Sequence, residues 1–337
     1  MHVFMIGGTG LLGSEAAREL IARGHTVSTL SLPPIPPGEQ LPPQLQVELG
    51  NYLELTDDEL RAHFAGCEGF VFAAGVDERV EGPPPIYDLF KRYNIDALER
   101  LLRIAKQSGV RHAVVYGSYF AYFEKLWPEK RLAHWHPYIR SRRDQERMAL
   151  AMASDDFSVG VLELPYIFGT QPGRKPVWVF LVESIRGMKG ATLWTRGGTA
   201  MVTVRQVAQA TAGALERTRG GVAYPLGWFN LTWRDMLQIV HRHLGTPEKK
   251  IRTIPRWMYA LGGRNIKKQQ AAAGHEGGLD MVRFADLQTS ELFIDRDLAS
   301  VPLGVTDDDL DSAIGESVAL SVAVLDGTAE VIDMKGE

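Results

Sequence analysis

Short apolar runs alternate with amphipathic stretches along the first half of the chain. The runs are bounded by turn residues and predict buried strands; they read HVFMIG, HTVSTLS, GFVFAAG, VRHAVVYGS and FSVGVLELPYIFG. Between them, apolar side chains recur at helical spacing in residues 14–23, 57–64, 86–108 and 137–153. Because parallel neighbours need a crossover connection, this alternation predicts an α/β fold with a doubly wound parallel sheet.

The pattern loosens after residue 170. Helical spacing recurs, between Gly- and Pro-bearing loops, in residues 178–188, 204–217 and 232–244. The segment AAAGHEGGLD is typical of a mobile loop, and the last dozen residues show little pattern. We therefore expect a smaller mixed lobe that partly crosses back to the first domain, with the chain divided into residues 1–170, 171–325 and a tail at 326–337.

Composition narrows the class of partner. The 337 residues are 45% hydrophobic and 23% charged, and no apolar stretch approaches the roughly 20 residues that cross a bilayer. A net charge of −4 provides no field that would attract nucleic acid or an anionic membrane, so we expect a small-molecule partner. Met1 leads straight into the first strand, which favours a cytoplasmic protein, and the lone Cys67 is expected to be a buried thiol.

Three glycines spaced three residues apart follow the first strand in GGTGLLG. Gly7 can adopt the left-handed conformation of a tight turn, Gly10 lets the backbone approach a pyrophosphate, and Gly13 lets the helix pack closely on the strand. The helix N-terminus behind them offers free N–H groups and the positive end of a dipole, which suit phosphate. The strand, turn and helix together predict a bound dinucleotide.

This GxxGxxG turn and the segments after it resemble the extended short-chain dehydrogenase/reductase superfamily, in its NAD-dependent epimerase/dehydratase branch. GNYLELTDDELRAHFAGCEGFVFAAG is similar to the family's third-strand region, although Asn51 stands where an acidic residue is usual. YNIDALERLLRIAKQSGVRHAVVYGS resembles the next helix and strand. LELPYIFG and GGTAMVTVRQVAQATAGALE resemble later segments, with Leu164 in place of a frequent arginine.

The resemblance implies a Rossmann domain that binds NAD(P), followed by a substrate lobe. The contacts to the cofactor that it implies are Gly7, Thr9, Gly10, Leu11, Leu12, Gly13, Ser31, Asn51, Ala73, Ala74, Gly75, Asn94, Tyr138, Arg142, Pro165 and Ile167.

The family's chemistry is carried by a serine, a tyrosine and a lysine in a YxxxK motif. The resemblance places the serine at Ser118 and the tyrosine at Tyr138, in HPYIRSRRDQERM, with Arg142 where the family has lysine. A spacing of four puts Tyr138 and Arg142 on one helical face, and a phenol with a pKa of about 10 needs a nearby cation to act as a proton shuttle. We assign Tyr138 as general acid/base, Ser118 as donor to the substrate oxygen, and Arg142 as electrostatic and ribose-binding partner. The alternative is a relic that binds a cofactor without catalysis.

Two other strings match functional motifs less well. YDLFK at residues 87–91 fits YxxxK literally, but it precedes Asn94 and is better explained as an ordinary pair on a surface helix. His134 and His136 in HWHP have no third ligand nearby, so we expect no metal site.

Cofactor choice and substrate are less sharply defined. Ser31 ends the second strand, where an acidic residue selects NAD and an arginine selects NADP. The lack of a carboxylate leaves a slight preference for NADP, with Ser28, Ser31 or a backbone N–H as phosphate ligand. The resemblance implies an oxidoreductase, epimerase or dehydratase that transfers hydride to or from a polar carbonyl or alcohol, such as a nucleotide sugar. The alternatives are a reductase of a secondary metabolite and a non-catalytic dinucleotide sensor. Family members often pair through two long helices, here 86–108 and 138–153, which would give a homodimer.

Overall fold

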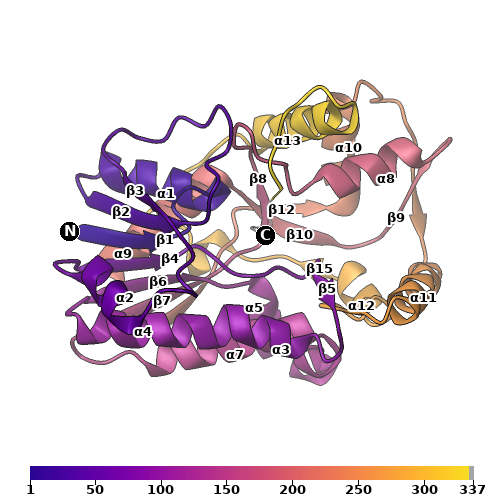
Figure 1. Ribbon diagram of the computed structural model, residues 1–337. Coiled ribbons are helices and arrows are strands. Elements are labelled where there is room, and N and C mark those ends of the chain that lie inside the picture. The colour runs from indigo at the N-terminus through magenta and orange to yellow at the C-terminus, as the bar shows by residue number, and fades with distance from the viewer. Residues whose placement is uncertain (334–337) are drawn as a thin grey trace.

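The computed structural model describes residues 1–333. Its central sheet has seven strands in the order β11–β7–β6–β4–β1–β2–β3 (Figure 1), and every neighbouring pair is parallel. The strands are β1 His2–Ile6, β2 Thr26–Ser31, β3 Gln46–Leu49, β4 Gly69–Phe72, β6 His112–Tyr116, β7 Ser158–Glu163 and β11 Gly221–Pro225. The sheet confirms the predicted doubly wound fold, and the strand order reverses between β1 and β4, where such sheets bind ligands.

Helices cover both faces of this sheet (Figure 1). One face carries α1 (Leu11–Ala22) and α9 (Val204–Arg217), and the other carries α2 (Asp57–Phe64), α4 (Ala97–Gln107) and α7 (Pro137–Ala151). The packing follows from sequence, since α4 buries Leu98, Leu101, Leu102 and Ala105 along one stripe. Each face therefore has its own apolar core, and the carboxyl ends of the strands stay available for a site.

The helix predicted over residues 86–108 is divided by a π-helical turn. It begins as α3 (Tyr87–Phe90), continues through the π-helical segment Lys91–Asp96, and ends as α4. The extra residue of the wider turn redirects backbone groups, and Asn94 lies within it. The Asn94 carbonyl accepts a hydrogen bond from Gln145 Nε2 at 2.7 Å, which ties this turn to α7.

The second lobe has its own small sheets. β8 (Tyr166–Phe168) and β12 (Phe229–Thr232) flank β10 (Gly198–Thr203), β15 (Glu291–Leu292) pairs with its start, and β9 (Thr192–Thr195) pairs with β13 (Ile251–Ile254). An apolar core joins these strands, except β15, to α8 (Val179–Gly187), α10 (Trp233–His243) and α13 (Leu310–Leu325). Between β10 and β12 the chain returns to the central sheet as β11. Further helices are α5 Tyr119–Leu126, α6 Leu132–Trp135, α11 Arg256–Ala272, α12 Phe284–Gln288 and the 3₁₀ turns Pro128–Lys130 and Arg296–Leu298.

The prediction of a mobile loop at AAAGHEGGLD is wrong. Its first residues end α11 (Arg256–Ala272), and β14 (Glu276–Gly277) pairs antiparallel with β5 (Glu81–Gly82). The Glu276 carboxylate also accepts a hydrogen bond from the Ile86 N–H at 2.9 Å. Glycine is needed at position 278, because a Cβ there would lie 2.8 Å from the Glu78 carbonyl oxygen.

The expected tail is partly ordered by pairing. The N–H of Ile332 donates to the Gly173 carbonyl at 2.9 Å, so residues 326–333 return to the second lobe. Its last four residues, 334–337, lie outside the described part of the chain. No helix within residues 1–333 is both long and apolar enough to cross a membrane.

The tight packing of Gly13 generates a stability prediction. A Cβ at this position would lie 2.1 Å from the Gly7 carbonyl oxygen, which is backbone and cannot move aside. We expect Gly13→Ala to lower the free energy of unfolding by about 1–3 kcal/mol or more, measured by urea denaturation. Gly187→Ala is the control, because its added methyl meets nothing within 4 Å. Equal stability of the two variants would contradict the packing described for α1.

Candidate active site

The glycine turn is shaped for close approach of a ligand. Gly7 has φ +87°, and a Cβ there would lie 2.7 Å from the Ala73 carbonyl oxygen. α1 starts after Gly10 without a side-chain cap and with no acidic residue in its first turn. The first N–H groups of α1 therefore face outward without an intrahelical acceptor, which suits a pyrophosphate. These residues fit a dinucleotide.

The end of β2 supports this turn from inside. Thr9 N–H donates to Ser31 Oγ at 3.2 Å, and the N–H of Gly8 donates to Thr29 Oγ1 at 2.9 Å. Ser31 is only 3% exposed, so its hydroxyl holds the turn rather than facing a phosphate. Ser28 is engaged with His2 at 3.0 Å. Neither serine is therefore free to be the phosphate ligand that the sequence suggests.

Tyr138 lies at the start of α7, directly after Pro137. Its N–H donates to the Gly278 carbonyl at 2.9 Å, which ties the first turn of α7 to the segment after β14. The ring is 4% exposed and packs edge-on against Phe90 and Phe120, with ring centroids 5.6 and 6.4 Å away. The phenol is thus held in one place and shielded from bulk water.

Arg142 lies one helical turn later and contacts the phenol directly. Its Nε donates to Tyr138 Oη at 3.0 Å. Nη1 donates to the Tyr116 carbonyl at 3.3 Å and to Gln145 Oε1 at 2.9 Å, and Nη2 donates to the Val76 carbonyl at 3.2 Å. A guanidinium has five N–H donors, so one remains for a ligand. Within residues 1–333 no carboxylate lies at ion-pair distance from this cation.

Two opposing influences set the charge state of Tyr138. Burial raises the pKa of its phenol above the ordinary value, and the Arg142 cation opposes that rise. The nearby carboxylate of Glu78 adds to the rise. The phenol therefore stays protonated at neutral pH, and because Arg142 donates to its oxygen, the hydroxyl proton is free to point elsewhere.

Ser118 is placed by the carboxyl end of β6. It is the N-cap of α5, where its Oγ accepts a hydrogen bond from the Phe120 N–H at 3.4 Å, and it is 6% exposed. The hydroxyl proton is not used in that bond. The strand end that carries Ser118 is joined to Arg142 through the Tyr116 carbonyl. The structure thus gathers the three predicted catalytic positions around the ends of β6 and α7.

Comparison with known proteins identifies the fold that carries these residues. A family described as NAD(P)H-binding matches residues 7–157. The solved structure of gox2253 is similar over 97% of this chain and 99% of its own, with a TM-score of 0.70 and 20% identity. UDP-glucuronic acid 4-epimerase from Bacillus cereus, solved in complex with NAD, is similar over 97% and 98%, with a TM-score of 0.67 and 13% identity. The chain has the fold of the extended short-chain dehydrogenase/reductases.

A curated relative covers almost the whole chain. A protein from Synechocystis sp. described as a putative dihydroflavonol 4-reductase is 23% identical over 331 residues, which is 94% of this chain and 93% of the relative. Because the solved structures match over 97% of the chain, the shared fold extends through both lobes, and the NAD(P)H-binding match lies in the first of them.

Other predicted cofactor contacts of this short-chain dehydrogenase/reductase fold divide into two groups. Gly10, Leu11 and Leu12 are partly exposed at the start of α1, as are Ala73 and Ala74 after β4, and Gly75 is exposed next to the Arg142 guanidinium. The residues of the second group are buried or already hydrogen-bonded within the protein. Thr9, Gly13 and Pro165 are buried. The Asn51 side chain bonds to Leu53 and Glu54, and the Ile167 carbonyl accepts a hydrogen bond from Trp178.

Asn94 acts as a support. It is fully buried, its side-chain oxygen accepts from the Val76 N–H at 2.8 Å, and its amide donates to the Val76 carbonyl at 3.0 Å. Gln145, which the sequence analysis missed, links Asn94 to Arg142. The signal was present, because Tyr138, Arg142 and Gln145 follow the i, i+4, i+7 spacing of one helical face.

The weaker motifs have ordinary partners. Tyr87 Oη donates to Asp144 at 2.8 Å, and Lys91 pairs with Asp96 at 2.5 Å. His136 Nδ1 accepts from the Asp280 N–H at 3.1 Å. Burial raises the pKa of Cys67 to about 11, so this thiol stays neutral. No cluster of three or more His, Cys, Asp or Glu side chains suited to a metal occurs in residues 1–333.

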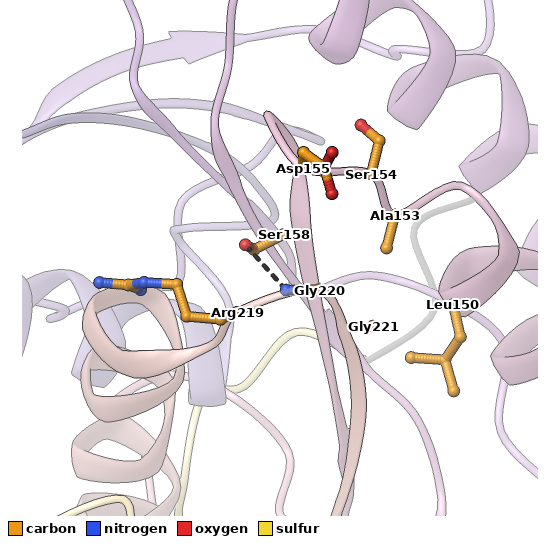
Figure 2. A pocket seen from close by; sticks show the side chains of 8 residues that line it. All are labelled: Leu150, Ala153, Ser154, Asp155, Ser158, Arg219, Gly220 and Gly221. Carbon is orange, nitrogen blue, oxygen red and sulfur yellow. Dashed lines mark hydrogen bonds between the residues drawn. The ribbon is translucent and has the colours of Figure 1, made fainter.

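A hollow of about 530 Å³ opens at the other end of the sheet (Figure 2). Ser158 and Gly221, the first residues of β7 and β11, line it, and Ser158 Oγ accepts from the Gly220 N–H at 3.2 Å. Ligands of doubly wound sheets bind at the carboxyl ends of the strands. This hollow lies at the amino ends, so it is separate from the candidate active site.

Two buried carboxylates lie behind the loop that follows β7. Glu163 ends β7, Glu146 comes from α7, and Lys125 Nζ of α5 lies 3.0 and 2.6 Å from them. Burial, helped by the negative charge of Glu146, raises the pKa of Glu163 to about 8, while Lys125 opposes this. One lysine thus lies between two acids, and Glu163 keeps its proton in the folded protein below about pH 8.

This arrangement predicts a pH dependence of stability. The unfolded chain releases the Glu163 proton near pH 4.3, whereas the folded chain keeps it until about pH 8. Its stabilising contribution is complete below the unfolded pKa and is lost as pH rises through the folded one. We expect Glu163→Gln, which mimics the protonated acid, to flatten the fall in melting temperature between pH 5 and 8. Glu248→Gln at an exposed site is the control, and parallel curves for both variants would refute the account.

Proposed function

We propose that the protein is an NAD(P)-dependent oxidoreductase that transfers hydride to or from a carbonyl or alcohol carbon of a small polar substrate. The observation that carries the proposal is the 3.0 Å hydrogen bond from Arg142 Nε to the hydroxyl of Tyr138. It joins a buried phenol to a fixed cation at the carboxyl ends of the strands, next to a turn that fits a dinucleotide. The NAD(P)H-binding match over residues 7–157 supports the cofactor class.

Each of the three side chains has a distinct task in this proposal. Tyr138 donates the proton that the substrate oxygen needs as it becomes an alkoxide, and Ser118 donates a hydrogen bond to the same oxygen. Arg142 fixes the phenol and keeps one N–H for a ribose hydroxyl. The dinucleotide, when bound, supplies or accepts the hydride. Burial of Tyr138 and Ser118 keeps bulk water away from these groups.

The charge state of Tyr138 favours one direction of reaction. Because burial keeps the phenol protonated, it is ready to act as an acid, whereas the reverse reaction first has to remove its proton. This charge state therefore suits proton donation to the substrate oxygen, the step that reduction of a carbonyl needs.

Two substrate classes have support. Nucleotide sugars are favoured by the similarity to UDP-glucuronic acid 4-epimerase. The second class is an aromatic secondary metabolite, for which the partly exposed ring of Tyr166, 6.2 Å from the ring of Tyr119, offers a stacking surface. The curated relative described as a putative dihydroflavonol 4-reductase supports the second class. A preference for NADP, a homodimer and a cytoplasmic location stay predictions.

Substitution of the phenol tests the catalytic assignment. Tyr138→Phe removes the proton donor but keeps the ring packing, so we expect turnover of a carbonyl panel with NADPH or NADH to fall about 10²- to 10⁴-fold while nucleotide binding is retained. Tyr87→Phe, in the string that matches YxxxK only by sequence, should leave turnover unchanged. Equal turnover of wild type and Tyr138→Phe would remove Tyr138 from the mechanism. Nucleotide binding with no turnover by the wild type would favour the non-catalytic sensor.

Replacement of Arg142 by lysine tests whether the site requires a guanidinium. Lysine has three donors on a single nitrogen and cannot reach the four acceptors that Arg142 bonds. We therefore expect Arg142→Lys to lower turnover about 10-fold or more and to lower the melting temperature. A higher turnover for Arg142→Lys would identify the arginine as the mark of a decayed site.

A further inference from the structure

A segment of the second lobe lies against the dinucleotide-binding turn. We call residues 171–175, which follow β8, the strap. Its Gln171 is buried, and Gln171 Nε2 donates to the Thr9 carbonyl at 2.9 Å and to Ser14 Oγ at 3.2 Å. Thr9 belongs to the glycine turn and Ser14 to the first turns of α1. The strap is therefore part of the wall around the site where the phosphates of a dinucleotide are expected.

The strap also contacts the Pro-rich loop that follows β2. Gly173 has φ +67°, and a Cβ there would lie 2.0 Å from the Pro37 carbonyl oxygen, so only glycine fits. On its other side the strap pairs with the C-terminal segment: Gly173 accepts from the Ile332 N–H at 2.9 Å, and the Lys175 N–H donates to the Ile332 carbonyl at 3.0 Å. The strap is held on both sides, and a side chain on it has a defined position.

Arg174 is the central side chain of the strap, and its charge lacks a partner. Its Nε donates to Gln171 Oε1 at 2.8 Å, and in residues 1–333 its two Nη groups donate to no protein atom. The side chain is half-buried, and burial lowers the pKa of its guanidinium. The nearby Glu39 is already paired with Arg18 at 2.5 Å, and no carboxylate in residues 1–333 forms an ion pair with Arg174 itself. A partly buried cation with free donors fits a missing anion.

We propose that Arg174 binds a phosphate group of the dinucleotide. Its neighbours identify which phosphate: the strap touches the loop after β2, next to which the adenosine ribose lies in doubly wound folds. The 2′-phosphate of NADP(H) fits this place. The pyrophosphate of the dinucleotide is the other phosphate that Arg174 could bind. The end of β2 itself has no arginine, and in this proposal the cation comes from the second lobe. The proposal rests on the NAD(P)H-binding site and not on the catalytic roles of Ser118 and Tyr138.

Nucleotide binding by the purified full chain tests this proposal without any turnover. The dissociation constants of NADPH and NADH are measured by calorimetric titration for wild type, Arg174→Gln and Arg174→Lys. Loss of a charged hydrogen-bond donor should weaken NADPH binding by Arg174→Gln about 10- to 100-fold, with NADH changed less than about 3-fold. Arg174→Lys keeps the positive charge, so its dissociation constant for NADPH should lie between those of wild type and Arg174→Gln.

Lys175→Gln is the matched control. It removes a positive charge from the adjacent position, where Lys175 pairs with Asp333 at 3.0 Å, and it should leave both affinities unchanged. Equal losses for NADPH and NADH in Arg174→Gln assign the arginine to the pyrophosphate instead of the 2′-phosphate. Unchanged affinity for both nucleotides would overturn the proposal, as would wild-type protein that binds neither.

Two further measurements complete the test. Thermal unfolding of each variant checks that the variant still folds. Tyr138→Phe separates nucleotide binding from the proposed reaction, because this variant should bind NADPH normally.

Discussion

The buried guanidinium of Arg142 joins the parts of the candidate site. Its acceptors come from three places: the phenol of Tyr138 and the amide of Gln145 on α7, the end of β6 at Tyr116, and the loop after β4 at Val76. A buried cation is costly unless its donors are satisfied, so these segments must stay in register for the fold to hold together. The hydrogen bond from Arg142 also fixes the Tyr138 phenol. The bonds that satisfy the buried cation are therefore the same ones that position the proposed proton donor.

The supporting structure around Arg142 explains several local irregularities. The Val76 carbonyl has to be presented at the correct angle, and Asn94 does this by bonding both backbone groups of Val76. Asn94 lies in a π-helical turn, whose wider spacing also gives its carbonyl to Gln145. The side chain at the centre of this network donates to four acceptors, whereas a lysine has only three N–H donors on one nitrogen. Arginine at position 142 meets this need, because its planar cation donates to all four acceptors at once.

Local pattern accounts for what could be predicted from the sequence. The strands, the glycine turn and the shared face of Tyr138 and Arg142 follow from spacing within short segments. Pairing between distant segments could not be predicted in this way: β14 joins β5, and Gln171 reaches Thr9 across 162 positions. Small residues such as Gly278 looked like a loop, although its carbonyl accepts the Tyr138 N–H. Only the folded chain shows which backbone passes close to them.

Ionisation of the Tyr138 phenol tests the account most directly, because it needs neither substrate nor cofactor. Tyrosinate absorbance near 295 nm can be titrated for wild type and Tyr138→Phe, and the difference between the two curves reports this phenol alone. Because burial outweighs the Arg142 cation, the midpoint of this difference is expected above the ordinary tyrosine pKa of about 10. A phenol that ionises near neutral pH in this difference would contradict the protonated, Arg142-held tyrosine on which the proposed reduction depends.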